Sequence, residues 1–208
     1  GVLLSSQGEA RAGFSSKRLN LPSLADDSVR AMAVGEDGAV YLGTGGELPS
    51  VLVYEKGQLR KLGQLDGGSF ITSLAVLGPG QVLAATAGDS RLIRLRAGGK
   101  PEVVAQLDGE RVWALLRDAK RGVTYAAAGP AALWAINDAD LQPIPAGQKP
   151  KAKARKLFGS EARQFLALSR GDDGALYLGT ADDAVLYRVE TNGDKATVRA
   201  VHDFAGNE

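Results

Sequence analysis

Residues 37–44 read Asp-Gly-Ala-Val-Tyr-Leu-Gly-Thr, and residues 173–180 read Asp-Gly-Ala-Leu-Tyr-Leu-Gly-Thr. Two related tracts lie between them, Gly-Gln-Val-Leu-Ala-Ala-Thr at 80–86 and Gly-Val-Thr-Tyr-Ala-Ala-Ala at 122–128. The last residues of these four tracts are separated by 42, 42 and 52 positions. A second marker, Gln-Leu-Asp-Gly, begins at position 64 and recurs 42 residues later. Two markers with one spacing predict an internal structural repeat.

Each repeat contains four short apolar tracts, separated by turn residues such as Gly, Asp and Asn. The tracts are 29–34, 39–44, 51–55 and 59–65; 71–77, 82–86, 92–95 and 102–107; 112–116, 123–128, 133–136 and a weaker 141–144; and 165–169, 175–180, 185–189 and 196–201. Their length and their content of Val, Ile, Leu and Tyr predict β-strands. The Asp-Gly and Asn-Gly pairs between them are typical of hairpin turns.

Four antiparallel strands in a period of about 42 residues are typical of a β-propeller blade. We therefore predict an all-β fold, a β-propeller with four-stranded antiparallel blades at about 25–66, 67–108, 109–160 and 161–204. Small residues in the second strands suit the close approach of blades near the axis, and Tyr41, Tyr125 and Tyr177 are expected to fill the wider gaps between sheets. A β-sandwich is the competing fold, but it would not require this repetition.

The two ends of the chain lie partway through a repeat. Residues 2–11 align with 51–60, which places the start in the third strand of a partial blade over 1–24, completed by 19–24. The prediction is four complete blades plus two extra N-terminal strands, within a larger propeller of six to eight blades. The missing blades would come from another polypeptide, from a further part of the protein or from a second copy. A closed four-bladed ring is the alternative, and it leaves 1–24 unexplained.

The tract at 37–44 resembles the repeat of two-component-regulator type propellers, in which a glycine turn and an apolar-aromatic strand end in Gly-Thr. It is also similar to bacterial and WD40-like propeller repeats. The resemblance covers most of 25–208, although tyrosine stands where the family has tryptophan, and the third tract ends in Ala-Ala-Ala at 126–128. The resemblance implies an extracytoplasmic sensing or binding module, hence a periplasmic or secreted location, and it supplies no catalytic residue.

Composition excludes several function classes. The 208 residues include 25 Lys and Arg against 24 Asp and Glu, a net charge of +1, so there is no strong nucleic-acid signal. With no cysteine and one histidine, His202, the chain has neither disulfides nor thiolate chemistry nor a multi-histidine metal site. We expect no cofactor, no bound metal and no membrane span.

Two groups of residues are candidates for binding. Arg30, Thr72 and Trp113 occupy equivalent positions in the first strands, as does Leu166, and they are expected to ring one mouth of a central channel. An aromatic beside an arginine suits contact with a glycan or a peptide. The alternative for Trp113 is packing between blades.

The second group is a basic run within an insertion at 145–160, which accounts for the longer third interval. It consists of Lys149, Lys151, Lys153, Arg155 and Lys156. These side chains suit phosphates, an anionic lipid or an acidic partner, and the alternative is a solvated loop without a partner.

The function predicted from these features is a non-enzymatic binding or assembly module, with a protein partner or a small ligand or glycan at one propeller face. The sensory part of an extracytoplasmic protein is one form of it. The alternative is a propeller enzyme, of the lactonase, lyase or quinoprotein kind, with an active site in the channel. Such an enzyme needs several carboxyl or amide groups that converge on the channel.

Overall fold

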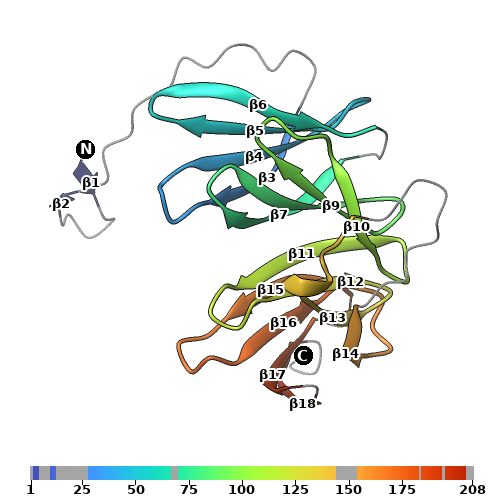
Figure 1. Ribbon diagram of the computed structural model, residues 1–208. Coiled ribbons are helices and arrows are strands. Elements are labelled where there is room, and N and C mark those ends of the chain that lie inside the picture. The colour runs from blue at the N-terminus through green and yellow to red at the C-terminus, as the bar shows by residue number, and fades with distance from the viewer. Residues whose placement is uncertain are drawn as a thin grey trace.

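The computed structural model describes residues 2–4, 10–12, 28–66, 70–143, 154–182, 184–193 and 195–204. These parts contain four antiparallel sheets of four strands each, a two-stranded hairpin and one short 3-10 helix (Figure 1). In every four-stranded sheet the strands follow one another in chain order, so each sheet is a simple meander. The prediction of an all-β chain built from repeated four-stranded units is confirmed.

The four sheets are named first to fourth in chain order. The first contains β3 (Ser28–Val34), β4 (Val40–Gly45), β5 (Ser50–Glu55) and β6 (Gln58–Gln64). The second contains β7 (Ile71–Gly78), β8 (Gln81–Thr86), β9 (Arg91–Arg96) and β10 (Glu102–Gln106). The third contains β11 (Arg111–Asp118), β12 (Val123–Gly129), β13 (Ala132–Asn137) and β14 (Arg155–Gly159). The fourth contains β15 (Phe165–Arg170), β16 (Leu176–Thr180), β17 (Val185–Asn192) and β18 (Lys195–Asp203).

The fourth strand of the third sheet corrects one sequence prediction. A weak strand was expected at 141–144, but 141–143 follow the 3-10 helix Asp138–Asp140 without forming a strand, and residue 144 lies outside the described residues. The fourth strand is β14, which pairs with β13 and contains Arg155 and Lys156 of the basic run. The strand therefore lies within the predicted insertion at 145–160, and the last part of that insertion belongs to the sheet. The prediction missed this strand because its apolar pair, Leu157 and Phe158, directly follows the basic run, which was interpreted as a loop.

At the N-terminus, β1 (Val2–Leu4) and β2 (Ala10–Ala12) pair as an antiparallel hairpin. Two extra strands were predicted here, and the second of them was placed at 19–24, which lies outside the described residues. Within the described residues, the partner of the first strand is instead found at 10–12.

The repeated tract forms the same turn twice. In the first sheet the Gly35 N–H donates to the Ala39 carbonyl at 2.8 Å, and the Ala39 N–H donates to the Asp37 carboxylate at 3.1 Å. Gly171, Asp173 and Ala175 of the fourth sheet make the same two bonds, at 2.9 and 3.1 Å. The glycine after each aspartate has a φ of 78° or 79°, a left-handed conformation that explains the Asp-Gly pair.

Replacing Gly38 with alanine is expected to lower the free energy of unfolding by about 1 kcal/mol, because alanine is strained at a positive φ. A new Cβ would meet no atom within 4 Å at this position, so the loss reflects the backbone alone. Gly78→Ala is the control, since Gly78 also has open space around it but no positive φ. Equal urea midpoints for the two variants would contradict this account.

The threonine that ends the tract holds the following loop. The Thr44 hydroxyl accepts the Ser50 N–H at 2.9 Å, and the Thr180 hydroxyl accepts the Val185 N–H at 2.8 Å. The Thr86 hydroxyl donates to the Arg91 carbonyl at 3.2 Å. In each case a side chain at the end of a second strand satisfies the backbone at the start of the third, so the motif is structural.

Successive sheets stack face to face, as Figure 1 shows from β3–β6 to β15–β18, and the three interfaces between them form the core. We call these interfaces the first, second and third joints. The first strands β3, β7, β11 and β15 contact one another in sequence. Among the described strands, the first and fourth sheets share no core cluster, so the row of sheets is open.

Two of the three tyrosines fill joints as predicted. The Tyr41 side chain is buried, and its hydroxyl accepts the N–H of Gly80 in the second sheet at 2.8 Å. The hydroxyl of buried Tyr125 lies 3.3 Å from that of Thr191 in the fourth sheet. Tyr177 is in the last sheet, where it is partly exposed and donates to Asp173 of its own sheet at 3.3 Å.

Candidate functional site

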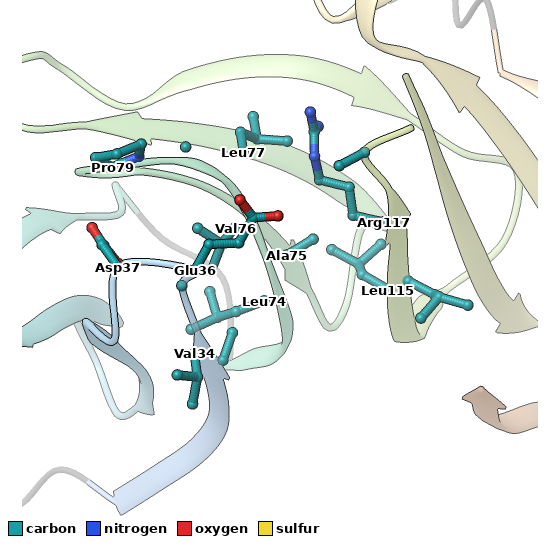
Figure 2. A pocket seen from close by; sticks show the side chains of 15 residues that line it. Val34, Glu36, Asp37, Leu74, Ala75, Val76, Leu77, Pro79, Leu115 and Arg117 are labelled. Atoms are coloured by element: carbon teal, nitrogen blue, oxygen red, sulfur yellow. The ribbon is translucent and has the colours of Figure 1, made fainter. Parts of the chain in front are cut away.

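A cavity lies where the first strands of three sheets end. Because β3, β7 and β11 are edge strands of their sheets and contact one another, their last residues and the turns after them surround a common space. The cavity has a volume of about 600 Å³. Figure 2 shows its lining, with Val34 and Glu36 from the first sheet, Leu74 to Pro79 from the second, and Leu115 and Arg117 from the third.

The walls of this cavity are held together by hydrogen bonds between β7 and β11. The Leu115 N–H donates to the Ser73 hydroxyl at 3.0 Å. The Thr72 hydroxyl donates to the Val112 carbonyl and, at 3.1 Å, to the Ala85 carbonyl. These side chains satisfy backbone groups at the edge of β11 that no strand covers, so the spacing of the two strands is defined beside the cavity.

The lining is mainly aliphatic, and its charged groups lie on opposite sides (Figure 2). Glu36 and Asp37 are exposed and belong to the turn after β3. Arg117, at the far side, donates two hydrogen bonds to the Asp138 carboxylate at 2.9 and 2.8 Å, so its charge is neutralised. The net charge at the cavity is therefore negative and comes from the turn of the first sheet.

A buried carboxylate joins the third and fourth sheets next to this site. The Asp118 side chain, the last residue of β11, is 3% exposed and accepts a hydrogen bond from Arg170 of β15 at 2.7 Å. Arg121 lies 3.7 Å from the same carboxylate and donates its backbone N–H to it at 3.2 Å. Burial raises the pKa of Asp118, but the bonds and charges of the two arginines outweigh burial and hold the pKa below its usual value.

The residues predicted to ring a channel mouth do share one structural position. Arg30, Thr72, Trp113 and Leu166 are each the extra residue of a β-bulge in the first strand of their sheet. A bulge redirects its side chain. The Arg30 guanidinium lies over the ring of Phe70, the residue before β7, 5.6 Å from the ring centre, and Thr72 bonds to the next sheet as described.

Arg30 and Thr72 therefore reach toward the next sheet, and all four side chains lie outside the lining of the 600 Å³ cavity. Trp113 is partly buried, with the Arg111 guanidinium 5.5 Å from its ring centre, and its buried indole N–H has no hydrogen-bond partner among the described residues. A binding role for Arg30, Thr72 and Trp113 remains a prediction.

The basic run is described in part. Lys149, Lys151 and Lys153 lie outside the described residues. Arg155 and Lys156 begin β14, and Arg155 donates to the Gly193 carbonyl of the fourth sheet at 3.1 Å. Arg155 also lines a second cavity of about 310 Å³, together with Arg121 and Thr191. Its position indicates a contact between two sheets, and anion binding by the run remains a prediction.

Sequence reasoning missed the cavity and the Asp118 pair. The available signal was positional: Arg117 and Arg170 each lie three residues after the alanine that follows the bulge. The sequence alignment of tracts did not reveal which sheet either arginine reaches. The prediction that Asp37 forms a turn is confirmed. That this turn also lies at the rim of a cavity depends on the neighbouring sheets, which the sequence did not reveal.

No family model matches this chain, and no curated protein matches it either. Among the described residues, no group of three or more His, Asp or Glu side chains is arranged to hold a metal ion. Within the same residues, no helix is long and apolar enough to span a bilayer.

Proposed function

We propose that the four sheets are blades of a β-propeller, one of six to eight blades when complete, and that the chain is a non-enzymatic binding and assembly module. Two features support the blade arrangement. The sheets stack in chain order with their first strands side by side, and equivalent residues fill each joint. The propeller places the first strands along a central axis, where the 600 Å³ cavity would open.

The observation that carries the binding role is this cavity. Aliphatic walls with a few charged groups at the rim are typical of ligand sites. Because Arg117 is paired with Asp138, the free rim charge comes from Glu36 and Asp37. The site therefore suits a ligand, or a side chain of a protein partner, that combines an apolar body with a cationic end.

Amine probes test this proposal. Phenethylamine is expected to shift the amide resonances of Val76, Leu77 and Arg117 in titrations followed by nuclear magnetic resonance, and phenethyl alcohol is expected to bind more weakly. Glu36→Gln should weaken phenethylamine binding by roughly threefold to tenfold, since one exposed charge contributes about 1 kcal/mol. The same change should leave phenethyl alcohol binding unchanged.

Glu47→Gln is the matched control, because Glu47 is exposed in the loop after β4 and lies outside the cavity lining. It removes the same charge from the chain without changing the rim. Equal binding of the amine and the alcohol, or equal loss in the two variants, would contradict a site built on Glu36.

A further inference from the structure

The first strand of the first sheet exposes apolar side chains at positions that are buried in the later sheets. We call this surface the leading face, and it contains Val29, Met32 and Val34. Val29 is 46% exposed, whereas the residues at the same position in the other sheets, Ile71, Val112 and Phe165, are 0% exposed. The equivalence follows from strand register, because each of the four pairs with the last residue of the repeated tract: Thr44, Thr86, Ala128 and Thr180. In the later sheets this position packs against the preceding sheet.

Met32 shows the same contrast. Its side chain is 68% exposed, while Leu74 and Leu115, at the equivalent positions, are buried in the first and second joints. Val34 is exposed, while the equivalent Val76 packs on the first joint. Exposed apolar side chains that form one face are typical of an interaction surface.

The fourth sheet exposes the opposite half of a joint, which we call the trailing face, containing Leu166 and Tyr177. Arg30 and Thr72, at the equivalent positions, reach toward the following sheet. Leu166 belongs to the last described sheet and is 45% exposed. Tyr41 and Tyr125 insert their hydroxyls into a following sheet, while Tyr177 bonds to Asp173 of its own sheet. The trailing face therefore has the side chains of a joint without the sheet that completes it.

We propose that the leading face of one chain docks on the trailing face of a second copy, head to tail, and forms a joint of the same kind as the three within the chain. The proposal rests on the blade arrangement of the proposed function. Both halves of the joint are present on the same molecule, and three joints show that a trailing face accepts a leading face. Two copies with four sheets each would form a ring of eight sheets, the upper end of the usual four to eight blades.

Charge placement favours this pairing. In the third joint, Arg170 of the fourth sheet pairs with Asp118 of the third sheet. At the joint between copies, repeat register places Val34 at the position of Arg170 and Gly171 at the position of Asp118. Arg188 of the trailing sheet is already paired with Asp173 at 2.7 Å and with Glu190. At these three positions the joint between copies buries no charge without a partner.

The test measures the mass of the 208-residue chain by sedimentation velocity and light scattering. At about 100 µM we expect a species of twice the 21.6 kDa chain mass. Met32→Glu, on the leading face, and Leu166→Glu, on the trailing face, should each give a monomer, since both residues are exposed in the single chain and tolerate the change. Leu48→Glu is the control, because Leu48 is exposed in a loop outside both faces and should leave the dimer intact.

Mixing the two monomeric variants separates this joint from any symmetric contact. The Met32→Glu chain keeps an intact trailing face and the Leu166→Glu chain keeps an intact leading face. One of the two joints of the ring is therefore intact in an equimolar mixture, which should dimerise again at a higher concentration than the wild type. A wild-type chain that remains at 21.6 kDa, or a mixture that remains monomeric, would overturn the proposal. Neither variant changes the lining of the 600 Å³ cavity, so amine binding and dimerisation can fail independently.

Discussion

Replacing Phe165 with alanine is expected to lower the free energy of unfolding by about 4 kcal/mol, the largest loss we predict for a single side chain. The Phe165 ring is 0% exposed in the third joint. It stacks on Phe158, with ring centres 5.6 Å apart, and meets the edge of Tyr187 at 6.0 Å. Its removal leaves a cavity between the third and fourth sheets that β-sheet backbones cannot collapse to fill. Equilibrium unfolding in urea measures the change.

Val29→Ala is the matched control, because Val29 has the same position in the repeat but is exposed. In dilute protein its loss should be below about 0.5 kcal/mol. If both variants lost similar free energy, the repeat position itself, rather than burial in a joint, would determine stability. An unchanged stability in Phe165→Ala would contradict the third joint.

Replacing Asp118 with asparagine is expected to lower the free energy of unfolding by about 2 kcal/mol at pH 7. Asparagine has nearly the same shape, but it removes the negative charge that neutralises Arg170 and Arg121. The loss should loosen the contact between the third and fourth sheets, because Asp118 and Arg170 belong to different sheets. Thermal and urea unfolding measure it. Glu190→Gln, which removes one charge from an exposed pair with Arg188, should leave stability nearly unchanged.

The pH dependence of this difference follows from the lowered pKa of Asp118. The unfolded chain binds a proton at this carboxyl near the usual value of 3.8, whereas the folded chain binds it only at a lower pH. The stabilisation is therefore complete well above pH 3.8 and is lost as the pH falls through the folded-state pKa. The difference between wild type and Asp118→Asn should be constant from about pH 7 to 5 and shrink below about pH 4. A constant difference down to pH 2 would contradict the ion pair.

Local patterns in the sequence were sufficient for most strands of the sheets and insufficient for the site. The repeated tract predicts a turn and a second strand from neighbouring residues, and hydrogen bonds at Gly35, Asp37 and Ala39 confirm it. The fourth strand of the third sheet was misplaced because the insertion before β14 interrupts the spacing on which the other strands depend. The cavity was missed because Glu36, Val76 and Arg117 belong to three sheets and share no motif.

The sequence by itself determined the repeat, the units of four antiparallel strands and the equivalent positions in their first strands, because strand period, turn residues and spacing act over short stretches of chain. Only the tertiary structure decided which equivalent residues are buried. Val29 and Phe165 hold the same place in the repeat, yet one is exposed and the other is enclosed. The difference depends on whether a neighbouring sheet covers that face, and burial by a neighbour is a property of the assembled row of sheets.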